Sequence, residues 1–204
     1  RANKIADEFN SNFIYLGSGD EYEAVDPLKK INPKIVVPIN FPEAYDVSDP
    51  YIYRLIPLSK LKHWELAPFN FKILKENNIE VAISSSGIKS TDQFWKNIRL
   101  VIQSGVDKTD VLKALTETPA NFIGQGENMG RLEKDMLASF TVYSSDPFID
   151  KNGKANEIWL KGERKPLKSF QEIEVKGSYH LNRQNKRFVL EFSGSAQRLK
   201  VSLF

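Results

Sequence analysis

The sequence contains no cysteine among its 204 residues. Disulfide bonds, thiolate nucleophiles and zinc sites with cysteine ligands are therefore excluded together. It contains only two histidines, His63 and His180, so this chain alone cannot supply the three or four histidines of a typical histidine-rich zinc site. The lack of cysteine does not identify a cellular compartment, because a protein of this size can be stable without cross-links.

Long apolar runs and a strong charge imbalance are also missing. No apolar stretch approaches the ~20 residues of a membrane-spanning helix, and we expect no membrane span. The 29 basic and 26 acidic residues give a net charge of +3, which indicates no nucleic-acid partner. Basic residues become more frequent after Lys151, and we interpret them as solubilising charge. The 41% hydrophobic and 27% charged residues are typical of a globular protein.

Short apolar runs alternate with helical segments in the first half of the sequence. Runs at 12–17, 34–39 and 79–83 predict strands, and helices are expected at about 20–30 and 68–76. Continuous apolar strands separated by helices are typical of a parallel sheet that is covered on both faces. The predicted fold class is therefore α/β, with three βα units and buried strands.

A long segment separates the second of these strands from the next helix. Residues 41–64 contain Pro42, Pro50 and Pro57, and we expect a loop there. Loops of this length in a compact domain are usually functional or disordered. This one follows the carboxyl end of a strand, where α/β proteins place their ligand sites.

The second half of the sequence turns first helical and then extended. Apolar residues at spacings of three and four predict a helix over 91–104. Asp107 is expected to cap the next helix, and Pro119 is expected to start a short helical turn that ends at Gly124. After Gly130, aromatic and β-branched residues predict strands at 139–143, 157–160 and 188–192, with weaker candidates at 175–181 and 199–204.

Two adjacent stretches carry the most specific pattern in the chain. Residues 114–124 read Ala-Leu-Thr-Glu-Thr-Pro-Ala-Asn-Phe-Ile-Gly, and residues 129–142 read Met-Gly-Arg-Leu-Glu-Lys-Asp-Met-Leu-Ala-Ser-Phe-Thr-Val. They resemble the closing stretch of amidohydrolase-superfamily enzymes, such as imidazolonepropionase-like and dihydroorotase-like proteins. The matching residues suit a helix start, a helix end and a tight turn. None of them carries chemistry.

Shorter stretches narrow the resemblance. Residues 62–68, 92–97 and 177–181 look like those of large Bacteroidetes amidohydrolase-like proteins. The resemblance implies that residues 1–129 form the last three βα units and closing helices of a (βα)8 metal-dependent-hydrolase barrel. Residues 130–204 are then expected to form a small β-domain and a C-terminal β extension. Export or a periplasmic location is expected from the same resemblance.

The resemblance also implies where a metal site would be. Active members of the family use a His-x-His pair on the first strand, often a carboxylated lysine, two further histidines and an aspartate that ends the last strand. Here residues 84–87 read Ser-Ser-Ser-Gly, and Ser86 occupies the position of that aspartate. A serine hydroxyl is a poor ligand for a divalent cation and is no base near neutral pH. Zinc or another divalent metal is expected only if residues upstream of Arg1 supply the ligands.

Five residues form the candidate pocket: His63, Glu65, Ser84, Ser85 and Ser86. His63 and Glu65 could shuttle a proton or bind a substrate, or they could anchor the loop. The serines could form a polar pocket floor or hold an anion. A nucleophilic serine would need His63 as its base. His180 is expected on the surface, and no cofactor-binding residues are expected.

Two functions remain open at the level of sequence. In the first, this part of an amidohydrolase-like protein is catalytically silent and has a binding or scaffold role. In the second, it is half of a metal-dependent hydrolase that acts on C–N bonds, such as non-peptide or cyclic amide bonds, and the upstream half supplies the ligands. Three βα units leave the edges of a parallel sheet open. We therefore expect a partner, either that upstream half or a second copy of the chain.

Overall fold

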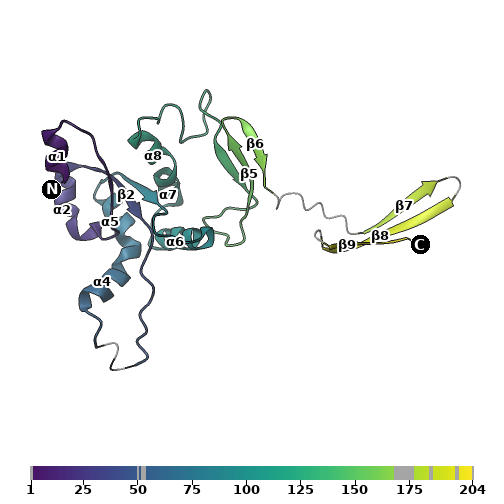
Figure 1. Cartoon of the computed structure of the whole chain (residues 1–204), viewed down its shortest axis with the longest axis horizontal. Coiled ribbons are helices and arrows are strands. Elements are labelled where there is room, and N and C mark those ends of the chain that lie inside the picture. The colour runs from purple at the N-terminus through teal and green to yellow at the C-terminus, as the bar shows by residue number, and fades with distance from the viewer. Residues whose placement is uncertain are drawn as a thin grey trace.

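The computed structural model describes residues 2–49, 51, 54–167, 177–183, 186–195 and 198–203. Helices and a parallel sheet come first, and antiparallel strands follow (Figure 1). The helical elements are α1 (Ala2–Glu8), η1 (Glu21–Ala24), α2 (Val25–Ile31), α4 (Leu58–Leu66), η2 (Ala67–Phe69), α5 (Asn70–Glu76), α6 (Thr91–Gln103), α7 (Lys108–Leu115) and α8 (Glu117–Phe122). The strands are β1 (Ile14–Leu16), β2 (Lys34–Pro38), β3 (Val81–Ser84), β4 (Phe140–Tyr143), β5 (Ala155–Leu160), β6 (Glu163–Pro166), β7 (Gly177–Arg183), β8 (Lys186–Ser195) and β9 (Arg198–Leu203).

The first three strands form a parallel sheet in the order β1-β2-β3. Ile14 lies opposite Lys34, and Ile35 lies opposite Val81. The side chains of Ile35 and Val81 are buried, as a parallel sheet covered by helices requires. The prediction of an α/β fold with three parallel strands is confirmed.

Strand β1 differs from its prediction in burial. The sequence predicted a buried strand, but Leu16 is 65% exposed and Ile14 is also exposed. The reason is its position, because β1 is the outermost strand of the described sheet and pairs only with β2. On its outer side, β1 therefore has backbone N–H and C=O groups without a strand partner in the described sheet. The apolar side chains of Ile14 and Leu16 are exposed on the same strand.

Three helices pack on the sheet and complete the core. Leu74 of α5, Ile98 of α6 and Val111 of α7 are fully buried and belong to one cluster with Ile35 and Val37 of β2. The helix predicted over 91–104 is confirmed by α6, whose buried residues lie on one face. The apolar spacing read from the sequence therefore located the core of this region.

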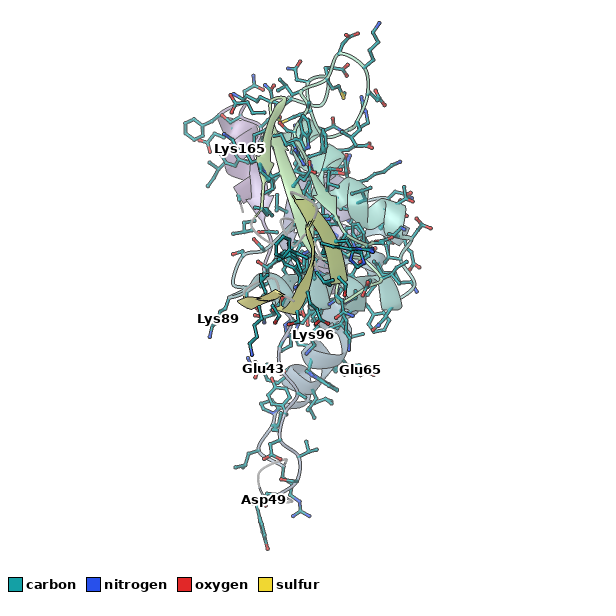
Figure 2. All side chains as sticks on the ribbon, turned by 90° about the vertical axis from the view of Figure 1, so that its right-hand side faces the viewer. Glu43, Asp49, Glu65, Lys89, Lys96 and Lys165 are labelled. Carbon is teal, nitrogen blue, oxygen red and sulfur yellow. The ribbon has the colours of Figure 1, made fainter. Side chains whose placement is uncertain are left out.

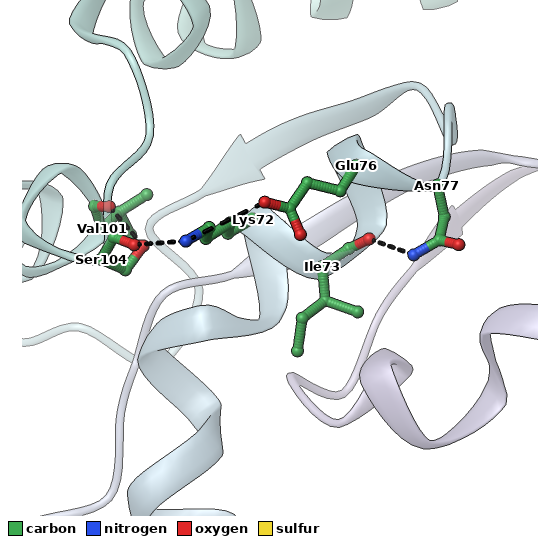
Figure 3. Close-up of polar contacts among 6 residues, drawn as sticks. All are labelled: Lys72, Ile73, Glu76, Asn77, Val101 and Ser104. Carbon is green, nitrogen blue, oxygen red and sulfur yellow. Dashed lines mark hydrogen bonds and ion pairs between the residues drawn. The ribbon is translucent and has the colours of Figure 1, made fainter.

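Polar contacts join α5 to the end of α6. Figure 3 shows Lys72 of α5, whose Nζ donates a hydrogen bond to the carbonyl oxygen of Ser104 at 3.0 Å and lies 3.9 Å from Glu76. The hydroxyl of Ser104 donates to the carbonyl oxygen of Val101 at 2.7 Å. Carbonyl groups at a helix end lack partners within the helix, and Lys72 supplies a donor for one of them.

Asp107 caps helix α7, as the sequence predicted. Its carboxylate accepts a hydrogen bond from the backbone N–H of Thr109 at 2.7 Å. This backbone hydrogen bond lowers the pKa of Asp107 below its usual value, and the charges of Lys75 and Lys108 add to the effect. A group whose pKa is lowered on folding stabilises the protein above its unfolded-state pKa and loses that contribution as the pH falls through its folded-state pKa.

We predict that Asp107→Ala lowers the Tm at neutral pH by about 2–4 °C, because the cap is lost. Asp107→Asn keeps a capping side chain but cannot titrate, so its Tm should fall less than that of the wild type between pH 6 and about pH 3. Thermal unfolding followed by circular dichroism at both pH values measures these changes. Equal acid sensitivity of Asp107→Asn and the wild type would contradict the prediction.

The second sheet is antiparallel, in the order β4-β5-β6. Strands at 139–143 and 157–160 were predicted, and β6 was not. Strand β6 contains charged residues and proline, and its pairing with β5 sets its conformation. The guanidinium of Arg164 donates to both carboxylate oxygens of Glu157 across the two strands, at 2.7 and 2.8 Å.

An aromatic cluster joins α6 to the second sheet. Trp95 packs edge to face against Tyr143 and Phe148, with ring centroids 5.6 and 5.4 Å apart. Nearby, the guanidinium of Arg99 donates to the carbonyl oxygen of Pro147 at 3.0 Å. Such aromatic pairs stabilise a contact beyond the apolar area that they bury.

The third sheet contains β7, β8 and β9, all antiparallel neighbours in sequence order. It lies apart from the other two sheets in Figure 1. The strands predicted at 188–192 and, within the described residues, at 175–181 and 199–204 are confirmed, while residues 175, 176 and 204 lie outside the description. The domain boundary between residues 129 and 130 stays a prediction.

The loop predicted over residues 41–64 is wrong in its second part. Helix α4 begins at Leu58 and contains His63. Pro57 has an extended backbone conformation and stands immediately before this helix. Proline is tolerated there because its missing N–H would have no partner within the helix. In the last short helix, α8, Pro119 stands inside rather than at the start. No helix within the described ranges is long and apolar enough to cross a membrane.

Candidate functional site

The carboxyl ends of β1, β2 and β3 meet at one edge of the parallel sheet. Residues 17–20 follow β1, Asn40 lies just after β2, and Ser85 follows β3. A β-carbon added at Gly87 would lie 2.7 Å from the side-chain amide nitrogen of Asn40, so the segments after β2 and β3 approach closely. Ligand sites of α/β folds form at this edge, and the candidate serines lie there.

Glu21 is the only acidic residue that is buried among the described residues, with 8% of its surface exposed. Its carboxylate accepts hydrogen bonds from the backbone N–H groups of Ser18 at 2.5 Å and Gly19 at 3.1 and 3.2 Å. It also accepts one from the side-chain amide of Asn70 at 2.6 Å. A carboxylate with these donors is satisfied locally, so Glu21 is engaged in holding the turn after β1.

Asn70 links this turn to the start of α5. While its amide nitrogen donates to Glu21, its amide oxygen accepts from the backbone N–H of Tyr22 at 2.9 Å. Both Asn70 and Glu21 are buried. Gly17 lies against this pair, because a β-carbon there would overlap a carboxylate oxygen of Glu21. A larger residue at position 17 would therefore displace the Glu21 carboxylate from its present hydrogen bonds.

The three candidate serines lie at the end of β3. Ser84 is the last residue of the strand and is half-buried, whereas Ser85 and Ser86 are exposed. The backbone N–H of Ser86 donates to the hydroxyl oxygen of Ser84 at 3.0 Å. Ser85 borders a shallow groove of about 520 Å³ whose other walls include Lys89, Phe94 and Leu115. The groove offers a mixed apolar and polar surface with one cation.

His63 does not contact these serines through any hydrogen bond in the described structure. Its Nδ1 lies 3.0 Å from the hydroxyl of Tyr22, and the two rings stack with centroids 6.1 Å apart. Burial raises the pKa of the Tyr22 hydroxyl above its usual value, and the charges of Glu23 and Asp20 raise it further. The Tyr22 hydroxyl therefore stays protonated at neutral pH, and its contact with His63 joins α4 to η1.

Glu65 lies two residues after His63 on the same helix and is exposed. Residues two apart on a helix do not face each other, so the structure does not bring this candidate pair together. His180 lies on β7 and is exposed, as expected from the sequence. The five candidate residues thus fall into two groups, the serines after β3 and the pair on α4.

The residues at this edge do not fit a divalent metal ion. In the described part of the chain, no three His, Cys, Asp or Glu side chains come together as a possible metal site. Glu21 is already satisfied by backbone and amide donors, and Ser86 offers an uncharged hydroxyl. A metal that activates water needs about three protein ligands and a base.

Sequence reasoning missed three residues that shape this edge. Glu21 and Asn70 fell within predicted helices and Asn97 within a stretch quoted for the family resemblance, but none of the three was given a role in the site. Asn97 of α6 is buried, and its amide donates to the carbonyl oxygen of Ile39 at 2.7 Å. A polar residue on the otherwise apolar face of α6 was the available signal for Asn97.

Comparison with known proteins identifies the fold. No protein-family model matches the chain, and no curated protein matches it either. Among solved structures, an amidohydrolase from Thermotoga maritima aligns with a TM-score of 0.61 and 21% identity, over 80% of this chain and 39% of that one. The chain therefore spans less than half of that structure.

Two further structures agree. A prolidase complexed with N-methylphosphonate-L-proline aligns with a TM-score of 0.53 and 10% identity, over 79% of this chain and 46% of that one. A Xaa-Pro dipeptidase with methionine bound in its active site aligns with a TM-score of 0.53 and 12% identity, over 80% of this chain and 47% of that one. These likenesses confirm the predicted amidohydrolase-like α/β fold, whereas a closed barrel and the Bacteroidetes subgroup stay predictions.

Proposed function

We propose that this chain, which has an amidohydrolase-like fold, is the catalytically silent C-terminal part of a larger amidohydrolase-like protein and has a binding or scaffold role. The observation that supports the proposal is the state of the polar groups at the carboxyl ends of the parallel strands. Glu21 is buried and already bonded to two backbone N–H groups and to Asn70. Ser86 stands where the family's aspartate is expected.

The chemistry of metal-assisted hydrolysis explains why these two residues matter. The metal must be held by several charged or imidazole ligands, and a base must take a proton from the metal-bound water. Freeing Glu21 for either task would break its bonds to Ser18, Gly19 and Asn70. The hydroxyl of Ser86 can neither take that proton near neutral pH nor hold a divalent ion well. A role in binding or in support of the fold requires neither task.

The open edge of the sheet supports a role in assembly with further chain. Strand β1 has exposed apolar side chains at Ile14 and Leu16 and a strand partner on one side only within the described chain. Natural proteins cover or pair such edges. We propose that further strands from an upstream segment or from a second copy complete this sheet. Export of the protein belongs to the same proposal and is tested by cell fractionation.

Zinc titration tests the proposal. We expect no stoichiometric zinc in the purified chain after incubation with excess zinc and gel filtration, measured by elemental analysis. Ser86→Asp should not create a stable site, because one added carboxylate leaves the ligand set incomplete. One equivalent of zinc that is lost in Ser86→Ala or Glu21→Gln would overturn the proposal.

The alternative is a metal-dependent hydrolase of C–N bonds whose ligands come from an upstream segment. It is favoured by one observation, the fold likeness to proteins named as a prolidase and a Xaa-Pro dipeptidase. The same zinc titration on the longer protein separates the two functions. Zinc bound next to Ser86 in a crystal soak of that protein would favour the hydrolase.

A further inference from the structure

A projecting segment separates β2 from α5. This segment, residues 41–66, is called the arm below; it includes α4 at its returning end. Figure 1 shows the described residues of the arm extending away from the sheet, and Figure 2 shows Asp49 far from the body with Glu43 and Glu65 nearer to it. The function proposed above assigns no task to the arm.

The two limbs of the arm carry opposite charge. Residues 41–53 contain three acidic residues and no lysine or arginine. Residues 54–66 contain three basic residues and one acidic residue, Glu65, which lies near the body. The acidic residues are Glu43, Asp46 and Asp49, and the basic residues are Arg54, Lys60 and Lys62. Segregation of this kind presents one negative and one positive limb on the same projection.

These charges form no salt bridge with one another or with the body in the part of the chain that the structure describes. Asp46 accepts hydrogen bonds from the backbone N–H of Ser48 at 3.0 Å and from its hydroxyl at 2.6 Å, and Asp49 accepts one from the backbone N–H of Tyr51 at 2.7 Å. The hydroxyl and backbone of Ser48 lower the pKa of Asp46. Because these donors are uncharged, they favour the ionised carboxylate of Asp46 and leave its negative charge uncompensated.

Apolar side chains are exposed between the charged residues. Tyr51 is 80% exposed and Leu55 is 81% exposed, and Val47 and Leu58 are also exposed. All four belong to one short stretch of the arm. Apolar groups gathered on a projection, with charge around them, are typical of a protein–protein contact.

We propose that the arm is a self-association surface on which a second copy of this chain docks, with the acidic limb of each copy against the basic limb of the other. The argument for a second copy is the presence of both charges on one surface. A two-fold interface joins the same surface to itself, so each negative group needs a positive group within that same surface. A surface for an unrelated partner needs charges that match that partner and has no need to match itself.

Charge reversal tests the pairing. An acid-reversed variant carries Glu43→Lys, Asp46→Lys and Asp49→Lys, and a base-reversed variant carries Arg54→Glu, Lys60→Glu and Lys62→Glu. Each variant alone then presents two limbs of the same charge. We expect the wild type to sediment as a dimer and each variant to have a dimer dissociation constant at least about ten-fold higher.

An equimolar mixture of the two variants is the decisive sample. In a mixed dimer, each reversed limb faces a limb of opposite charge, so mixing should restore dimers to within about three-fold of the wild-type dissociation constant. Circular dichroism of each variant verifies folding, and restoration by mixing requires folded chains. The matched control reverses three exposed lysines outside the arm, Lys113, Lys151 and Lys154, and should dimerise as the wild type does.

Three results would overturn the inference. A wild-type chain that stays monomeric across the accessible concentration range removes the second copy as the occupant. Dimers that persist in both reversed variants show that another surface, such as the edge of β1, holds the copies together. Variants that remain monomeric after mixing show that the limbs do not face each other. None of these results depends on zinc binding, so they are separable from the test of the proposed function.

Discussion

Replacing Leu74 with alanine is expected to lower the free energy of unfolding by about 3–4 kcal/mol. Leu74 lies on α5 with 0% of its surface exposed and belongs to the core cluster between the parallel sheet and the helices. Removing three carbon atoms there loses their burial and leaves a cavity that the packed surroundings fill only partly. Urea unfolding followed by circular dichroism measures the change.

Leu112→Ala is the matched control for Leu74→Ala. Leu112 lies on α7 and is 45% exposed. Its replacement leaves no enclosed cavity, so we expect a loss below about 1 kcal/mol. Similar losses for the two variants would mean that the cluster around Leu74 is not the main core.

Replacing Asn70 with alanine is expected to lower the free energy of unfolding by about 2–4 kcal/mol. The amide of Asn70 donates to the Glu21 carboxylate and accepts from the backbone N–H of Tyr22. The variant therefore leaves a buried carboxylate with one donor fewer and a backbone N–H without its acceptor. The same urea titration at neutral pH measures the loss.

Two further variants make this prediction specific. Asn152→Ala removes an exposed asparagine side chain, and we expect its effect to stay within about 0.5 kcal/mol. In the double variant Glu21→Gln with Asn70→Ala, the buried charge is absent, so the added cost of removing Asn70 should shrink. Additive losses in the double variant would show that Glu21 and Asn70 do not act as a pair.

The elements that could be predicted from the sequence are those in which the order of apolar and polar residues reflects which side chains are buried. Isoleucine and valine runs predicted β2 and β3 because strands covered on both faces leave no polar position. Apolar spacing predicted α6, and Asp107 predicted the start of α7 because its side chain caps the helix. In these segments the local pattern and the tertiary environment impose the same structure.

Three segments differ from the sequence analysis, one because a local signal was misread and two because tertiary position decides the outcome. Helix α4 was read as loop because Pro57 was taken as a loop residue, although proline is common at helix starts. Strand β6 lacks the alternation of a strand and is extended because it pairs with β5. The exposure of β1 reflects its edge position, which residue types in one segment do not reveal.

The candidate site also contains residues that local sequence predicts and residues that only the tertiary structure brings together. The three serines at the end of β3 were predictable because a strand ends there, and the structure places them at the carboxyl edge of the sheet. The pairing of Glu21 with Asn70 joins residues 49 positions apart, a distance over which local patterns carry no signal. Only the folded chain shows that Glu21, the buried acid at this edge, is already engaged.

Helix α6 is held from two directions at once. On one side Trp95 interlocks with Tyr143 and Phe148 of the β4–β5 region. On the other, Asn97 holds the carbonyl oxygen of Ile39 where the arm leaves the sheet. Helix α6 therefore contacts both the second sheet and the start of the arm. Trp95 and Asn97 are two residues apart, so the contact with the second sheet and the contact with the root of the arm lie within one turn of the same helix.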